Sequence, residues 1–188
     1  INAKAPMPLV LRAGVMVESG DYKSASSDIN LAIQLAPRLA RAYEERALLF
    51  VRSKKYSNAL EDLDKAIGFE PDMASLYLNR ANIKASLKNY AAAVKDLDHV
   101  IAKKPSSIQA YANRGRCYKE MNKINEALRD FNKALSLAPK QADVLLARSQ
   151  LYSAAKQYTQ ALNDMNKVVQ LIPRNFTGID LFVVKHFA

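Results

Sequence analysis

Residues 110–139 read AYANRGRCYKEMNKINEALRDFNKALSLAP, and this stretch carries the pattern from which most of the chain is built. Apolar residues recur at helical spacing on both sides of a polar turn at residues 121–125, and Pro139 ends the second run. The stretch therefore predicts two helices. Because the turn between them is short, the two helices are expected to lie antiparallel.

The same pattern returns every 34 residues. Residues 76–105 read LYLNRANIKASLKNYAAAVKDLDHVIAKKP, and residues 42–71 read AYEERALLFVRSKKYSNALEDLDKAIGFEP. A fixed internal period of this length indicates a stacked array of two-helix units, whereas a globular helical bundle would not require one. We therefore predict a solenoid over residues 1–175. Its five repeats are expected at residues 6–39, 40–73, 74–107, 108–141 and 142–175.

Each repeat places small residues where two helices would have to approach closely. Counted from the start of the repeat, the eighth and twentieth places are small, and the twenty-fourth is bulky and apolar. Small residues allow close backbone approach, and their large neighbours fill the space beside them. The eighth place holds Ala13, Ala47, Ala81, Gly115 and Ser149, and the twenty-fourth holds Ile29, Leu63, Leu97, Phe131 and Met165.

With these residues, the tyrosines at the fourth place (Tyr43, Tyr77 and Tyr111) and the closing prolines, the pattern resembles the tetratricopeptide repeat family over residues 6–175. The resemblance implies an all-α fold, a right-handed α-solenoid of five tandem 34-residue helix-turn-helix repeats. Residues 176–188 are expected to form one more helix, because their apolar residues fall where those of a first helix would fall. This C-terminal helix would cap or continue the array.

Two charged columns run through all five repeats. The seventh place is always Arg and the twenty-third is always Asp. One cation and one anion in each repeat predict a recurring structural ion pair, either between the two helices of a repeat or between neighbouring repeats, rather than five catalytic dyads. The residues are Arg12, Arg46, Arg80, Arg114 and Arg148, and Asp28, Asp62, Asp96, Asp130 and Asp164.

The composition limits the classes of function. The single cysteine among 188 residues excludes an intramolecular disulfide and a cysteine-rich metal site, and it is compatible with a reducing compartment. The net charge of +10 favours acidic partners. No apolar run approaches the roughly 20 residues that span a bilayer. Because the chain begins with Ile1 rather than Met, the lack of a signal peptide says nothing about localisation.

Convergent polar groups of the kind that catalysis requires are scarce. His99 occupies a column otherwise filled by lysine and leucine, which predicts a solvated face. Cys117 occupies an otherwise aliphatic column, which predicts a packed core thiol. Neither a glycine-rich phosphate loop nor a cluster with metal-ligand spacing is present. We therefore predict a protein that is not an enzyme, with no catalytic residues, metal, cofactor or small-molecule substrate.

The resemblance implies that the first helices line a concave groove in which a protein or peptide partner binds. Asn79, Asn82 and Asn113 are the most suggestive groove residues, because Asn is a poor helix former. Its amide both donates and accepts, which suits the backbone of an extended peptide; the alternative is that they are ordinary surface residues. The predicted function is a protein–protein interaction scaffold or adaptor that binds an extended peptide or a helix. The expected groove residues are Arg41, Glu44, Leu48, Asn79, Asn82, Gln109, Asn113, Arg116 and Lys119.

One familiar variant of this groove is disfavoured. Family members that capture the acidic C-terminal tail of heat-shock chaperones use three cations and two asparagines on successive first helices. Both asparagines are present here, but all three cations are missing. Capture of a carboxylate depends on charge-assisted bonds from such cations. The corresponding places hold Leu78, Asn82, Asn113, Asp143 and Ala147.

The turns within the repeats form a second candidate surface, a basic ridge. Its lysines would keep the solenoid soluble, or they would dock an acidic protein, an anionic membrane or nucleic acid. Contact with nucleic acid is expected to be weak and salt-dependent, since the tyrosines lie in core columns rather than among the cations. Self-association through residues 176–188 is compatible with either function. The ridge residues are Lys54, Lys55, Lys88, Lys123 and Lys156.

Overall fold

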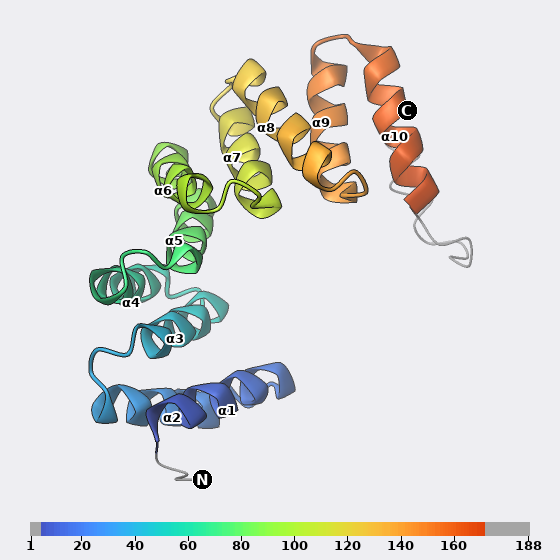
Figure 1. Cartoon of the computed structure of the whole chain (residues 1–188). Coiled ribbons are helices and arrows are strands. Elements are labelled where there is room, and N and C mark those ends of the chain that lie inside the picture. The colour runs from blue at the N-terminus through green and yellow to red at the C-terminus, as the bar shows by residue number, and fades with distance from the viewer. Residues whose placement is uncertain (1–4, 172–188) are drawn as a thin grey trace. The chain divides into compact units, whose positions relative to one another are not determined.

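The structure is a computed structural model that describes residues 5–171, and over these residues the chain forms ten α-helices and no β-strand (Figure 1). The predicted helix at residues 176–188 lies outside the described residues. The first helix of each hairpin begins at the first residue of a predicted repeat. The helices are α1 (Pro6–Ser19), α2 (Tyr22–Leu35), α3 (Ala40–Arg52), α4 (Tyr56–Phe69), α5 (Ala74–Ser86), α6 (Tyr90–Lys103), α7 (Ile108–Glu120), α8 (Ile124–Leu137), α9 (Ala142–Ala154) and α10 (Tyr158–Leu171).

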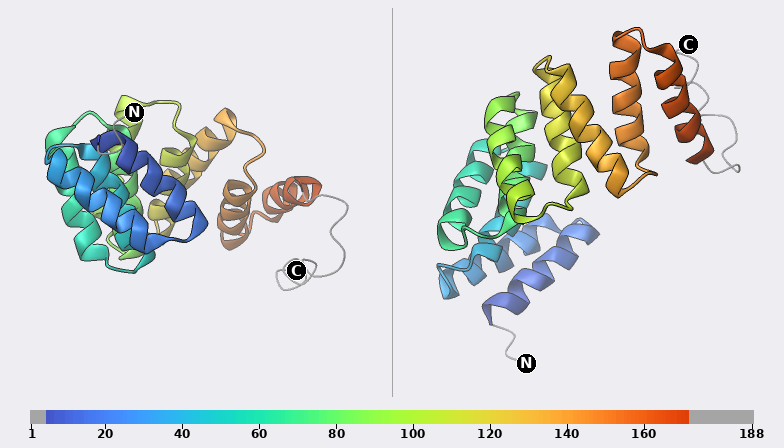
Figure 2. Two further views of the ribbon diagram at one scale, coloured as in Figure 1. Left: turned by 90° about the horizontal axis from the view of Figure 1, so that it is seen from below. Right: turned by 45° about the horizontal axis from the view of Figure 1, so that its top comes forward.

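The chain divides into two compact units, residues 1–110 and residues 111–188, called here the first and the second unit. In the first unit, α1 and α2, α3 and α4, and α5 and α6 form hairpins, and α2 packs against α3 and α4 against α5. In the second unit, α8 packs against α9, and α9 forms a hairpin with α10 (Figure 2). The predicted all-α architecture of stacked helix-turn-helix hairpins is therefore confirmed.

A single residue in the left-handed conformation makes each turn within a hairpin possible. The amide of the residue after it donates to a carbonyl oxygen five residues back, as from Lys55 N to Phe50 O at 2.8 Å, and this bond closes the first helix. The turn at residues 121–123 is shorter than predicted, because Lys123 is the N-cap and Ile124 already belongs to α8. The left-handed residues are Gly20 (φ 85°), Lys54 (57°), Lys88 (61°), Asn122 (57°) and Lys156 (58°).

Replacing Lys88 with glycine is expected to stabilise the protein. A side chain in the left-handed region costs about 1–2 kcal/mol, and the greater chain entropy of glycine in the unfolded state offsets only part of that gain. We expect the free energy of unfolding to rise by about 0.5 kcal/mol in urea denaturation. Lys104→Gly is the control, because Lys104 has a φ of −136° and gains no strain relief. A loss of stability in both variants would contradict the prediction.

The small residues of the repeats lie where the helices meet. Ala47 and Leu63 are both fully buried, in a cluster that also contains Leu76 and Ile83 and so joins α3, α4 and α5. Gly115 faces the ring of the fully buried Phe131: a Cβ atom on this glycine would lie 2.7 Å from the Cε1 atom of Phe131. The core is therefore continuous through successive hairpins of a unit. The size of the residue at the eighth place is matched to that of the residue that faces it.

The first hairpin differs from the predicted pattern. Val15 shares its column with Leu49, but Val15 is 66% exposed and Leu49 only 8%. Leu49 packs against Ala13 and Ile29 of the preceding hairpin, whereas no described helix precedes α1 to cover Val15.

None of the described helices combines the length and the apolar character needed to cross a membrane.

Candidate functional site

The Arg and Asp columns meet in every hairpin. Arg46 donates to Asp62 twice, from Nε to Oδ2 at 2.7 Å and from Nη2 to Oδ1 at 2.9 Å. Each of these bonds joins the first helix of a hairpin to its second helix, and the five carboxylates are buried. Paired, charge-assisted bonds of this kind are the strong form of the Arg–carboxylate contact. The same two bonds join Arg12 to Asp28, Arg80 to Asp96, Arg114 to Asp130 and Arg148 to Asp164.

Arg46, Arg80 and Arg148 also reach the preceding hairpin. The Nη1 atom of Arg80 lies 2.7 Å from an oxygen of Asp64 on α4, so one guanidinium links two hairpins. Arg12 has no such partner among the described residues, and its side chain is 54% exposed against 18% for Arg80. The bond to Asp96 raises the pKa of Arg80 above its ordinary value. The equivalent links run from Arg46 to Asn30 and from Arg148 to Asn132.

Sequence reasoning missed the acceptors on the preceding hairpin, although a signal for them exists. The twenty-fifth place of the repeat is Asn or Asp in all five repeats, so it is as regular in chemistry as the Arg and Asp columns. The oxygens of Asn30, Asp64 and Asn132 accept from the arginine of the next first helix, which is a reason for short acceptor side chains at this place. The column is Asn30, Asp64, Asp98, Asn132 and Asn166.

Three of the predicted groove residues line one pocket in the first unit. Leu48 of α3 and Asn79 and Asn82 of α5 are among the residues that line a pocket of about 190 Å³. Residues of α4 form part of its wall, and their contribution could not be predicted from columns alone, because the pocket is a gap left by packing. The lining residues are Ala47, Leu48, Val51, Tyr56, Leu63, Asn79, Asn82, Ile83 and Ser86.

Glu44 corrects the predicted groove. It was expected to face a partner, but it is only 2% exposed. Its carboxylate accepts from Arg41 Nη1 at 3.1 Å and from Asn79 Nδ2 at 2.9 Å, because Asn79 of the next first helix lies against it. Arg41 also pairs with Glu45 at 2.8 Å, and burial raises the pKa of Glu45. We call these three charged residues of α3, with a net charge of −1 when ionised, the Arg41–Glu44–Glu45 cluster.

Three of the groove residues predicted on α7 make polar contacts within the second unit: Asn113, Arg116 and Lys119. Arg116 donates to Asn113 Oδ1 at 2.8 Å and forms an ion pair with Asp143 of α9. Lys119 donates to Gln150 Oε1, also on α9, at 3.2 Å. Gln109, in the first turn of α7, is exposed. A partner that binds this face would therefore meet a network of polar contacts between α7 and α9.

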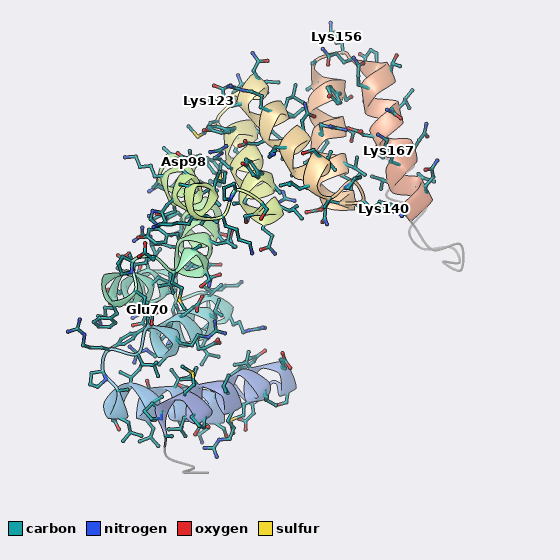
Figure 3. All side chains as sticks on the ribbon, in the orientation of Figure 1. Glu70, Asp98, Lys123, Lys140, Lys156 and Lys167 are labelled. Carbon is teal, nitrogen blue, oxygen red and sulfur yellow. The ribbon has the colours of Figure 1, made fainter. Side chains whose placement is uncertain are left out.

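The lysines predicted for the basic ridge are all exposed. In the second unit, Lys123 and Lys156 lie at the end where the hairpins turn, and Lys140 and Lys167 lie towards the opposite end (Figure 3). The latter two line a pocket of about 310 Å³ with Pro139, which sequence reasoning did not single out. Exposed cations at both ends of this unit are consistent with its excess of positive charge.

Neither His99 nor Cys117 offers reactive chemistry at the surface. The prediction of a solvated His99 was wrong: its ring stacks on that of Tyr77 with centroids 3.8 Å apart, and its Nε2 atom is buried without a hydrogen-bond partner among the described residues. Burial raises the pKa of Cys117 to about 11, so the thiol is protonated at neutral pH. Within residues 5–171, no group of three or more potential ligands is arranged to hold a metal ion.

Stacked antiparallel hairpins joined by side-chain clamps place the chain in the class of helical-repeat scaffolds. The family model of the tetratricopeptide repeat matches residues 40–73, 74–106, 108–141 and 142–175. The chain therefore belongs to the tetratricopeptide repeat family, whose members are in general non-catalytic scaffolds that bind protein or peptide partners.

Solved structures of similar fold come from several repeat proteins. PilF of Pseudomonas aeruginosa superposes with a TM-score of 0.84 at 21% identity, over 92% of this chain and 78% of that one. MamA of Desulfovibrio magneticus RS-1 gives 0.80 at 16%, over 88% and 94%. YrrB, described as a tetratricopeptide repeat protein with an unusual peptide-binding site, gives 0.73 at 19%, over 93% and 90%. A sequence search of curated proteins found no match.

Proposed function

We propose that this protein is a scaffold that captures an extended peptide segment of a partner protein on the first helices α3 and α5 of its first unit. The observation that carries the proposal is the pocket between α3 and α5, where Leu48 offers apolar surface and Asn79 and Asn82 offer amides. Repeat scaffolds present such surfaces to extended partners without chemistry of their own.

The amides are suited to hold a peptide backbone. Asn has two N–H donors and a carbonyl oxygen with two lone pairs. One donor of Asn79 is used by Glu44, and this bond fixes the orientation of the amide beside the pocket. A side chain that is already oriented loses less conformational entropy when it binds. The pair Asn79 and Glu44 therefore supports the proposal, although Glu44 itself is too buried to meet a partner.

The variant Asn82→Ala tests the proposal, because Asn82 lines the pocket. The probe is a set of nine-residue peptides selected by the wild-type protein from a random library displayed as internal segments, with affinities measured by fluorescence polarisation. We expect about a fivefold loss of affinity, as removing one bond of about 1 kcal/mol would produce. The control is Lys88→Ser with Lys123→Ser, which should bind as the wild type does. Normal binding by the asparagine variant together with weakened binding by the lysine variant would reject the groove as the binding site.

A second candidate function is electrostatic docking through the turn lysines. The observation in its favour is that Lys54, Lys88 and Lys156 occupy left-handed positions that glycine would fill at lower cost, so these turns carry a cation despite the backbone strain. An acidic partner would then bind with a steep dependence on salt, since exposed charges are screened within about 8 Å at physiological ionic strength. Measuring affinity between 50 and 500 mM salt separates the two functions, because groove binding is expected to change little (roughly twofold or less).

A further inference from the structure

We infer that the pocket lined by the loop at residues 138–141 and the C-terminal end of α10 binds a carboxylate from an acidic segment of a partner protein. Lys140 and Lys167 supply the positive charge. The site lies in the second unit and uses no residue of a first helix, so it is separate from the face between α3 and α5. Both lysines lie towards the end of the unit opposite Lys123 and Lys156, so the site is also separate from the turn lysines (Figure 3).

The repeat brings two particular places together where one hairpin follows another in the first unit. The residue at the thirty-third place, in the loop between two repeats, meets the residue at the thirtieth place of the next repeat, which is the last residue of its second helix. Lys103 Nζ lies 2.5 Å from Asp72 Oδ1, and Arg38 Cζ lies 5.6 Å from the centre of the Phe69 ring. The contact between these two places is therefore a property of the repeat, whatever residues fill them.

One of these contacts shows what the thirty-third place carries when cations stand beside it. The hydrogen bond from Lys103 lowers the pKa of Asp72, and the interaction with His99 acts in the same direction to a smaller extent. Lys103 fills the thirtieth place of its repeat and His99 the twenty-sixth. In the first unit, a carboxylate is thus held in its charged form by side chains from the end of the next second helix.

The corresponding places of the second unit carry cations but no anion. Lys140 stands at the thirty-third place, where Asp72 stands in the first unit, and Lys167 stands at the twenty-sixth place, where His99 stands. Both lysines line a pocket of about 310 Å³, and no acidic residue is among the described residues that line it. Two ammonium groups at one pocket repel each other, and a carboxylate from outside would offset that repulsion. The pocket therefore lacks the anion that the first unit supplies for itself.

The other lining residues suit a protein segment. Gln170 offers an amide that donates to a carboxylate or to a peptide carbonyl, and Pro139 and Leu171 offer apolar surface to the methylene groups of an acidic side chain. The described lining contains no aromatic ring on which a nucleic-acid base could stack. Arg129 and Lys133, both exposed on α8 of the same unit, add to the positive field that attracts an acidic segment.

The experiment measures the binding of a defined acidic peptide to the full chain. The probe is a capped, fluorescently labelled nine-residue peptide of alternating glutamate and serine, and a second peptide carries glutamine in place of each glutamate. We expect the glutamate peptide to bind about tenfold more tightly than the glutamine peptide, as two exposed ion pairs together would produce. A phosphoserine peptide of equal net charge, vesicles of phosphatidylserine and phosphatidylcholine, and a single-stranded uridine oligomer are titrated beside it.

Two variants and a control locate the binding. Lys140→Asp supplies at this place the carboxylate that Asp72 supplies in the first unit, so it should weaken binding of the glutamate peptide about tenfold. Lys167→Gln should weaken it about threefold, as the loss of one exposed ion pair would produce. Lys123→Asp is the matched control, because it makes the same change in net charge at an exposed lysine at the opposite end of the unit, and binding should stay within about twofold. Circular dichroism confirms that each variant is folded.

Each outcome supports the inference or overturns it. Weakened binding by Lys140→Asp and Lys167→Gln, with normal binding by Lys123→Asp, would support it. Equal losses in Lys140→Asp and Lys123→Asp would show that net charge rather than the pocket attracts the peptide. Tighter binding of the phosphoserine peptide, the vesicles or the uridine oligomer would assign the site to phosphate groups, and no binding of the glutamate peptide would leave the pocket without its ligand; all three results would overturn the inference. Peptides selected for the face between α3 and α5 should bind Lys140→Asp as they bind the wild type, so this inference and the proposed function can fail independently.

Discussion

Replacing Arg80 with alanine is expected to lower the free energy of unfolding by about 3 kcal/mol, because the change leaves a buried carboxylate without its main partner. Arg80 donates twice to Asp96, which is 4% exposed, and also reaches Asp64 of the preceding hairpin. The loss is placed at the low end of the range for broken buried pairs, since Lys84 stays 2.8 Å from Asp96. One substitution thus removes a clamp within a hairpin and a link between two hairpins.

Urea unfolding followed by circular dichroism measures this loss, and the chain contains its own control. Arg12 makes the same two bonds to Asp28 but is exposed, and within residues 5–171 it has no link to a second hairpin. Arg12→Ala should therefore cost clearly less than Arg80→Ala. Arg80→Lys should fall between the wild type and Arg80→Ala, since it keeps the charge but loses the fork of donors. Equal effects at Arg12 and Arg80 would show that burial of the clamp is unimportant.

The Arg and Asp columns show how far a repeat sequence can be interpreted without a structure. A period of 34 residues and small residues at fixed places predict the hairpins, because both follow from helix packing that each repeat must satisfy. The pairing of Arg46 with Asp62 follows from the same regularity. Its extension to Asn30 was missed, because only the stacking of one hairpin on the next brings that acceptor within reach.

The candidate site was less predictable than the fold. Places in a repeat indicate which way a side chain points on average, and Leu48, Asn79 and Asn82 do line the pocket. They do not indicate what stands opposite, so Glu44 was placed in the groove although Asn79 of the next helix covers it. The prediction for His99 failed for the same reason. The lysines at the same place in other repeats indicated a solvated side chain, but they could not indicate that the ring would stack on Tyr77. A contact that does not recur from repeat to repeat, such as that of Glu44 with Asn79, needs coordinates.

Replacing Gly115 with alanine is expected to destabilise the protein by about 1 kcal/mol, although alanine is the better helix former. The added Cβ atom would lie 2.7 Å and 2.8 Å from two ring carbons of Phe131, and 3.3 Å from the carbonyl oxygen of Ala127. Phe131 is fully buried, so its ring cannot turn away without disturbing the core. Overpacking of this kind costs about 1–3 kcal/mol, and the gain in helix propensity of about 1 kcal/mol offsets only part of it.

The other repeats indicate how to reverse this loss. Alanine at the eighth place faces leucine at the twenty-fourth in the second and third repeats, whereas glycine faces phenylalanine in the fourth. The double variant Gly115→Ala, Phe131→Leu recreates the smaller pair, so its stability should lie within about 0.5 kcal/mol of the wild type, and the coupling between the two changes should exceed about 1 kcal/mol. Gly68→Ala is the control for propensity alone, because nothing lies within 4 Å of its added Cβ. Additive losses in the double variant would mean that the two sizes are not matched to each other, and that Gly115 is required for some other reason.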